Sequence, residues 1–164
     1  MARFFRTSSG RTRARAVGVL AACFATWDLW AIAMAAIIWW RALVAIGLYT
    51  LSIGLFTWAV RACRQHPPTA IFETDVPTYF VDRGPYQYVR HPFYATYILF
   101  WLASWVASNS WAALVSLIVM SAIYVHGARE EEAKFRASAF AAAYAQYRRR
   151  TGFLTPRLGR EQRR

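Results

Sequence analysis

The sequence predicts an all-α membrane protein with about four transmembrane helices in two hairpins, followed by a cytoplasmic C-terminal helix. Three observations predict this fold class. The 164-residue chain is 57% hydrophobic and only 17% charged, whereas charged residues make up about a quarter of a typical soluble domain. The apolar residues fall in long runs separated by short polar turns. The net charge of +12 comes from residues between and beyond those runs, where membrane lipids are the expected partner and nucleic acid is not.

The first two apolar runs predict one transmembrane hairpin. Residues 17–40 form a run long enough to cross a hydrocarbon core of about 30 Å, interrupted by Asp28 near its middle. Residues 43–60 form the second run, so the turn between them is centred on Arg41. Because a carboxylate that faces lipid is costly, Asp28 is expected to face the helix bundle or another subunit.

The basic N-terminal segment, residues 1–16, resembles the start of a secretory signal. The apolar run after it is too long for the apolar region of a signal, however, and it ends in two tryptophans and an arginine instead of a small-residue cleavage site. We therefore expect a retained signal-anchor helix. Cys23 and Cys63 lie within or just past apolar runs and have no metal-ligand spacing, so both are interpreted as packing residues, with no metal site or disulfide predicted.

The second hairpin is predicted from residues 93–107 and 111–127, joined by the polar turn 108–110. All but one of the 20 Lys and Arg residues lie outside the two short turns, which predicts that both termini are cytoplasmic, in a bacterial-type inner or plasma membrane. The chain then divides into a basic arm, a first hairpin, a cytoplasmic loop, a second hairpin, a cytoplasmic segment with a helix over 130–147, and a basic tail: residues 1–16, 17–60, 61–91, 92–128, 129–157 and 158–164.

A dense group of polar and aromatic residues, from Gly84 to Tyr94, precedes the second hairpin. Pro92 suits the first position of a helix, where its missing N–H costs nothing. Arg90 and His91 are therefore expected at the cytoplasmic N-terminus of a membrane helix, where free N–H groups, the helix dipole and a guanidinium attract an anionic group. The alternative is an arginine that extends to lipid phosphates and a histidine that only caps the helix.

A second group, residues 129–135, begins where the last span meets the cytoplasm. Helical spacing predicts two surface ion pairs, Glu130–Lys134 and Arg129–Glu132. Glu131 shares a helix face with Phe135 and points inward if that ring packs. An inward carboxylate at this position indicates function; the alternative is an ordinary solvated helix end.

These two groups flank the second hairpin and share one side of the membrane. Because a hairpin returns the chain to the side that it left, Arg90 and His91 are expected to lie near Glu131 and Glu132. An anion-attracting helix start beside a carboxylate pair suits a zwitterionic or polyhydroxylated cofactor.

Five segments of the C-terminal half follow a known order and spacing: Gly84-Pro85-Tyr86, Arg90-His91-Pro92-Phe93-Tyr94, Arg129-Glu130-Glu131-Glu132-Ala133-Lys134-Phe135, Phe140-Ala141-Ala142-Ala143-Tyr144-Ala145-Gln146-Tyr147 and Pro156. With these segments, residues 80–157 resemble the integral-membrane methyltransferases of the isoprenylcysteine carboxyl methyltransferase and phospholipid methyltransferase group. The first hairpin is similar to that group only in hydropathy.

The resemblance implies that S-adenosylmethionine binds in a cytoplasm-facing pocket and that a lipophilic acceptor arrives through the membrane. It implies a cofactor-binding role for seven residues: Tyr86, Arg90, His91, Tyr94, Glu131, Glu132 and Tyr147. It also implies a catalytic group that approaches the methyl acceptor: Arg129, Tyr144 and Arg148. The acceptor is left open between a prenylated thiol or carboxylate, a phospholipid amine and a small thiol, and no oligomeric state is predicted.

Two other functions compete with methyl transfer. Membrane reductases of the sterol reductase type share a similar motif but typically place an asparagine that bonds the nicotinamide cofactor where this chain has Phe93. A non-catalytic membrane scaffold is the other alternative, and it is favoured by Thr96, which stands where the methyltransferases usually carry glycine. Two further departures from the family pattern are conservative in size: Ala141 for glycine and Phe135 for leucine.

Overall fold

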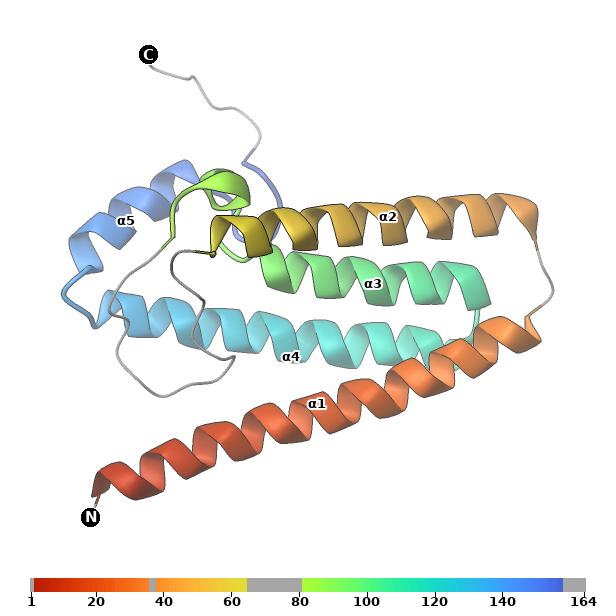
Figure 1. Cartoon of the computed structure of the whole chain (residues 1–164), viewed down its shortest axis with the longest axis horizontal. Helices are drawn as coiled ribbons and strands as arrows, with labels where there is room; N and C mark the ends of the chain where they lie inside the picture. Colours follow the sequence, from red (N-terminus) through yellow and green to blue (C-terminus); the bar gives the residue numbers. More distant parts are fainter. Residues whose placement is uncertain (1, 36–37, 65–80, 158–164) are drawn as a thin grey trace.

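The computed structural model of the chain describes residues 2–35, 38–64 and 81–157. Within them lie five α-helices and one short 3-10 helix (Figure 1): α1 (Ala2–Met34), α2 (Trp39–Ala62), η1 (Gly84–Gln87), α3 (Pro92–Ser108), α4 (Trp111–Arg136) and α5 (Ala141–Arg150). The all-α fold class is confirmed. Part of the predicted cytoplasmic loop, and the predicted basic tail, lie outside the described residues.

Helices α2, α3 and α4 lie side by side with α3 between the other two, and α1 crosses the bundle along α3 and α4 (Figure 1). Although α1 and α2 are consecutive in the chain, α1 packs chiefly on the second hairpin, formed by α3 and α4. The ring of Phe24 in α1 meets Trp101 of α3 edge-on at 6.4 Å. Ser116 of α4 donates to Asp28 Oδ1 at 3.2 Å. Asp28 is only 2% exposed, which confirms the expectation that it faces the bundle.

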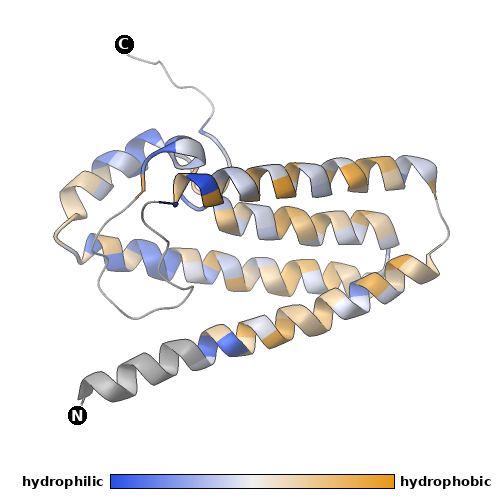
Figure 2. Cartoon of the chain, viewed as in Figure 1, coloured by the Kyte–Doolittle hydropathy of each residue, from blue (hydrophilic) through white to orange (hydrophobic). Residues whose placement is uncertain are grey.

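Among the described residues, three helices are long and apolar enough to cross a membrane, over Thr12–Met34, Trp39–Ala62 and Trp111–Arg136. Helix α3 has 17 residues and at about 1.5 Å per residue reaches about 25 Å, slightly less than a hydrocarbon core. Large apolar side chains remain exposed along the outer faces of the long helices, and polar residues gather at one end of the bundle (Figure 2). The chain is an integral membrane protein.

Helix boundaries differ from the prediction at several places. The predicted turn at Arg41 is wrong, because α1 already ends at Met34 and α2 begins at Trp39. The helix predicted over 130–147 is interrupted between α4 and α5. Ser138 causes this break: its hydroxyl donates to the carbonyl of Phe135 at 2.8 Å and accepts from the N–H of Phe140 at 3.1 Å, so the side chain replaces bonds of the helical ladder.

The turn between α3 and α4 sets the position of the functional groups. Asn109 closes α3 in the left-handed conformation, with φ 51°, and its N–H donates to Trp105 O at 2.7 Å. Asparagine tolerates this conformation better than most residues. Ser110 then caps α4 by accepting from Ala112 N at 3.2 Å. Because the turn is so short, the start of α3 and the end of α4 lie at the same end of the bundle (Figure 1).

Candidate active site

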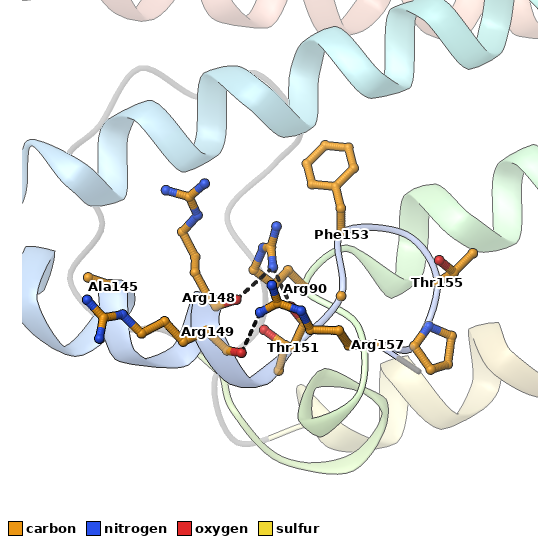
Figure 3. A pocket seen from close by; sticks show the side chains of 10 residues that line it. Arg90, Ala145, Arg148, Arg149, Thr151, Phe153, Thr155 and Arg157 are labelled. Atoms are coloured by element: carbon orange, nitrogen blue, oxygen red, sulfur yellow. Dashed lines mark hydrogen bonds between the residues drawn. The ribbon is translucent and has the colours of Figure 1, made fainter. Parts of the chain in front are cut away.

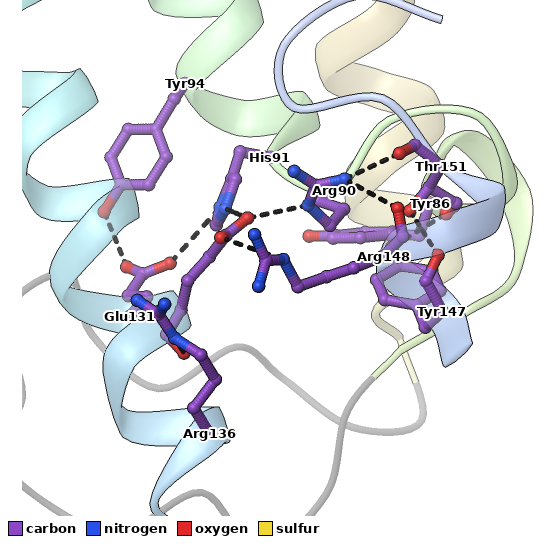
Figure 4. Close-up of polar contacts among 10 residues, drawn as sticks. Tyr86, Arg90, His91, Tyr94, Glu131, Arg136, Tyr147, Arg148 and Thr151 are labelled. Atoms are coloured by element: carbon purple, nitrogen blue, oxygen red, sulfur yellow. Dashed lines mark hydrogen bonds and ion pairs between the residues drawn. The ribbon is translucent and has the colours of Figure 1, made fainter. Parts of the chain in front are cut away.

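A buried ion cluster joins the start of α3 to the last turns of α4 (Figure 4). Arg90 Nε donates to Glu132 Oε1 at 2.7 Å. His91, the residue before the first turn of α3, places Nδ1 3.6 Å from Glu131 Oε2 and Nε2 3.4 Å from Glu132 Oε1. The side chains of Arg90 and Glu132 are 10% and 7% exposed. The expectation that these four residues lie together is confirmed.

Glu132 is thus an inward residue and not a surface one. The predicted surface pair between Glu132 and Arg129 is wrong, because Glu132 turns toward Arg90 while Arg129 is exposed. Glu130, at the surface, lies 3.4 Å from His126. The sequence indicated one inward carboxylate, whereas the structure places both Glu131 and Glu132 in the cluster.

The segment after α5 approaches the cluster from a third direction. Arg90 Nη1 donates to the backbone carbonyls of Thr151 at 2.6 Å and Arg148 at 3.3 Å. Arg148 Nε lies 3.4 Å from Glu132 Oε2. Glu132 therefore faces cations from both the start of α3 and the end of α5. The guanidinium of Arg90 connects the start of α3 to α4 and to the end of α5.

A short parallel bridge between Val89 and Gly152 holds this segment in place. The N–H of Arg90 donates to Gly152 O at 2.9 Å, and the N–H of Gly152 donates to Tyr88 O at 2.9 Å. A Cβ at Gly152 would lie 1.7 Å from Thr155 O. The backbone can therefore fold this closely only because the residue is glycine.

Aromatic rings cover the inner side of the cluster. Tyr94 OH donates to Glu131 Oε1 at 2.6 Å. The ring of Phe153 lies edge-on to His91, with centroids 5.1 Å apart, and 5.7 Å from the guanidinium carbon of Arg90. These rings exclude water from the ion pairs and so strengthen them.

Two buried tyrosines of α5 extend the aromatic wall. Tyr144 stacks on Phe135, with centroids 4.7 Å apart and planes 13° from parallel. Tyr147 OH donates to the carbonyl of Tyr86 at 2.8 Å, and Cys63 Sγ donates to the hydroxyl of Tyr86 at 3.5 Å. Burial raises the pKa of Tyr144 and of Tyr147, so both hydroxyls stay neutral at physiological pH.

Burial and neighbouring charge act in opposite directions on His91. Burial disfavours the imidazolium and by itself would lower the pKa of His91, but the negative charge of Glu131 and Glu132, both at ion-pair distance, outweighs it and raises that pKa above the ordinary 6.5. The cluster therefore stabilises a protonated His91 beside two carboxylates.

Two buried nitrogens of the cluster, His91 Nε2 and Arg148 Nε, have no hydrogen-bond partner among the described residues. Each lies 3.4 Å from an oxygen of Glu132, close enough for an ion pair but without hydrogen-bond geometry. An unsatisfied buried donor costs about 1–3 kcal/mol of stability. A ligand that supplies the missing acceptor would remove this cost, so the two nitrogens point to a bound ligand.

The structure brings together nearly all of the residues that the resemblance implied. Arg129 lies apart, because it is exposed on α4 and no contact joins it to the cluster within the described ranges. Thr151 and Phe153 belong to the cluster but were not predicted. The only sequence signal for them is Gly152, which marks the end of a helix without indicating where the chain then turns.

An open pocket of about 700 Å³ lies beside the cluster, between the end of α5 and the segment that follows it (Figure 3). The cluster and the pocket share four residues: Arg90, Arg148, Thr151 and Phe153. Ten residues line the pocket: Arg90, Ala145, Arg148, Arg149, Thr151, Gly152, Phe153, Thr155, Pro156 and Arg157.

The fold and the site together define an integral membrane protein with a candidate ligand site at the polar end of its helical bundle. Comparison with known families gives its class. A family model described as phospholipid methyltransferase matches residues 40–143, more than half of the chain. The chain belongs to the phospholipid methyltransferase family. The matched range includes α3, α4 and both carboxylates of the cluster, and it ends just before Tyr144. A search of curated proteins found no match.

Proposed function

We propose that the chain is an S-adenosylmethionine-dependent methyltransferase that acts on a lipophilic or membrane-delivered acceptor. The observation that carries the proposal is the buried ion cluster with unsatisfied donors on His91 and Arg148. Its place at the polar end of a membrane bundle favours a site that a soluble cofactor reaches from one side and a lipid-borne acceptor from the other. Family membership supports methyl transfer as the chemistry.

The groups of the cluster fit this cofactor. The unsatisfied donors of His91 and Arg148 suit its carboxylate. Glu131, whose side chain is 34% exposed, is the more open of the two carboxylates and suits the ammonium or the ribose hydroxyls. The buried rings of Tyr144 and Tyr147 suit the sulfonium, because aromatic faces attract cations.

Bound there, S-adenosylmethionine supplies an electrophilic methyl group on a sulfonium. The chain contributes position and the exclusion of water. Glu132 orients Arg90 and Arg148, while the Arg90–Thr151 bond holds the segment after α5 against the site. In this proposal Arg148 and Tyr144 approach the methyl acceptor, while Tyr86 and Tyr94 act on the cofactor side. Arg129 keeps its implied role only if it reaches the acceptor from the exposed face of α4.

Transfer of a labelled methyl group tests the proposal directly. Membranes that contain the wild-type chain, incubated with methyl-labelled S-adenosylmethionine, are expected to carry label in their lipid-extractable fraction or on an added lipophilic acceptor. Glu132→Gln at equal protein level should abolish this label, and Glu130→Gln, a surface carboxylate, should retain it. Equal labelling with Glu132→Gln would contradict the proposal.

The reductase alternative has less support. Phe93 stands where such reductases carry the cofactor-binding asparagine, and its ring packs edge-on against Phe56 at 5.5 Å, so it offers no polar group. Binding of NADPH instead of S-adenosylmethionine by the purified chain would favour the reductase. Glu131→Gln and Arg90→Ala variants that leave every phenotype of the wild type intact would favour the non-catalytic scaffold.

A further inference from the structure

The pocket beside the ion cluster carries positive charge that the proposed cofactor site does not use. Four of its ten lining residues are arginines and none is acidic: Arg90, Arg148, Arg149 and Arg157. Arg90 and Arg148 are compensated in part by Glu132. Across residues 12–35, 38–64 and 81–157, no carboxylate lies within ion-pair distance of Arg149 or Arg157. The pocket therefore has an excess of positive charge.

Arg157 is held in this position by the backbone. Its Nη1 donates to the carbonyl of Arg149 at 2.6 Å (Figure 3), and that carbonyl belongs to the last turn of α5, where the helix itself supplies no partner. The bond brings a guanidinium from beyond Gly152 back over the end of the helix. Its charge is thereby placed at the pocket, and none of the acids in the described part of the chain neutralises it.

A basic helix end alone does not account for this arrangement. Arginines in the last turn of α5 interact favourably with the helix dipole and with lipid phosphates, and this explains Arg149. Arg157, however, lies seven residues after α5 ends, and the charges border a hollow of about 700 Å³ and not a flat face. Planar guanidinium groups bind phosphate and carboxylate oxygens in pairs.

We infer that this pocket binds an oxyanion, a phosphate or a carboxylate, carried by the methyl acceptor, and that Arg149 and Arg157 select it. The identity of the ligand as the acceptor rests on the proposed function. The inference narrows the acceptor to molecules with a negative group close to the methyl-accepting atom. An uncharged small thiol is then a poor acceptor.

Equilibrium binding to the detergent-solubilised full chain tests this inference. Three short-chain probes are titrated by tryptophan fluorescence: dihexanoylphosphatidylethanolamine, which has a phosphate; N-acetyl-S-decylcysteine, which has a carboxylate; and uncharged dihexanoylglycerol. The first two probes carry an oxyanion and are called the anionic probes, although the ammonium of dihexanoylphosphatidylethanolamine balances its phosphate. At least one of them should bind and dihexanoylglycerol should not, and the one that binds more tightly identifies the source of the oxyanion. Calorimetry on the same samples measures S-adenosylmethionine binding.

Arg149→Gln/Arg157→Gln is expected to weaken the anionic probe about tenfold or more, without changing S-adenosylmethionine binding. Arg149→Lys/Arg157→Lys keeps the charge but not the planar guanidinium, so it should weaken the anionic probe less than Arg149→Gln/Arg157→Gln does. Arg61→Gln/Arg64→Gln makes the same change in charge at exposed positions outside the pocket and should have no effect.

Equal binding of dihexanoylglycerol, or no larger loss in Arg149→Gln/Arg157→Gln than in the control pair, would overturn the inference. A wild-type chain that binds S-adenosylmethionine but neither anionic probe would overturn it while the proposed function stands. Arginine-dependent binding of an anionic probe without S-adenosylmethionine binding would support the oxyanion pocket and contradict methyl transfer.

Discussion

Glu132 is the residue on which the ion cluster depends. Its carboxylate accepts from Arg90 and lies at ion-pair distance from His91 and Arg148, three cations from two separate segments of the chain. Removing one partner of a buried ion pair leaves uncompensated charge, which is more costly than the pair itself is favourable. The burial of Glu132 therefore makes this position far less tolerant than the neighbouring Glu130.

Glu132→Gln is expected to lower the free energy of unfolding by about 3 kcal/mol, because Arg90 and Arg148 lose the carboxylate that faces both of them. Glu130→Gln is the matched control: its partner His126 is exposed, so the change should stay within about 0.5 kcal/mol. Unfolding in mixed detergent micelles measures both values. Equal effects of the two substitutions would show that the cluster is not buried as described.

The raised pKa of His91 predicts a pH dependence with a definite sign. A pKa that folding raises above the ordinary 6.5 stabilises the protein fully below that value, and this contribution is lost as pH rises through the folded pKa. The thermal midpoint of the wild type should therefore fall as pH is raised from about 6 toward about 9. His91→Gln should lack this component, and identical pH profiles for the two proteins would refute the assignment.

The residue scale also shows what sequence reasoning could and could not find. The spacing of Pro92 and of the glutamates predicts that Arg90 and His91 meet Glu131 and Glu132. The same spacing predicts the wrong partner for Glu132, because it cannot show that Arg90 reaches α4 from the segment before α3. Thr151 joins the site through its backbone carbonyl, which its side chain does not signal.

At the scale of elements, the segment after α5 acts as the closing piece of the site. The Val89–Gly152 bridge fixes it to the start of α3, and Arg90 binds two of the carbonyls at the end of α5. The helix predicted over 130–147 overlaps α5, but helix propensity does not indicate the close contact after it. The break between α4 and α5 is equally local, because it depends on one hydroxyl, that of Ser138.

Gly152→Ala is expected to destabilise the protein by about 2 kcal/mol or more, because the new methyl group would meet the backbone oxygen of Thr155. It should also weaken S-adenosylmethionine binding, since the Arg90 bonds depend on this segment. Gly54→Ala is the control: a Cβ there meets no atom within 4 Å. Thermal midpoints and calorimetric titrations measure both effects. A Gly152→Ala variant with the stability and cofactor affinity of the wild type would contradict the role of this segment in closing the site.

At the scale of the whole molecule, the fold class followed from hydropathy because the lipid phase requires every backbone group to be paired within a helix. The packing of α1 did not follow from it. Hydropathy cannot show that Asp28 meets Ser116, and this pair helps to place α1 against α4 instead of α2. The orientation of the bundle is a separate prediction, based on the distribution of arginines.

Both termini and the ion cluster are expected on the cytoplasmic side. In a chain without its native cysteines, Trp111→Cys, at the exposed start of α4, should react with a membrane-impermeant maleimide in intact cells. Arg64→Cys, just beyond the C-terminal end of α2, should react only after permeabilisation. Both native positions are exposed, so accessibility depends on the membrane alone, and the opposite labelling pattern would invert the topology.

Binding of S-adenosylmethionine by the purified full chain tests the central claim most directly. Calorimetry should show saturable binding to the wild type and to Glu130→Gln, none to Glu132→Gln, and no binding of NADPH to any of them. A wild-type chain that fails to bind S-adenosylmethionine, or a Glu132→Gln chain that binds it equally well, would contradict the assignment of the ion cluster as the cofactor site.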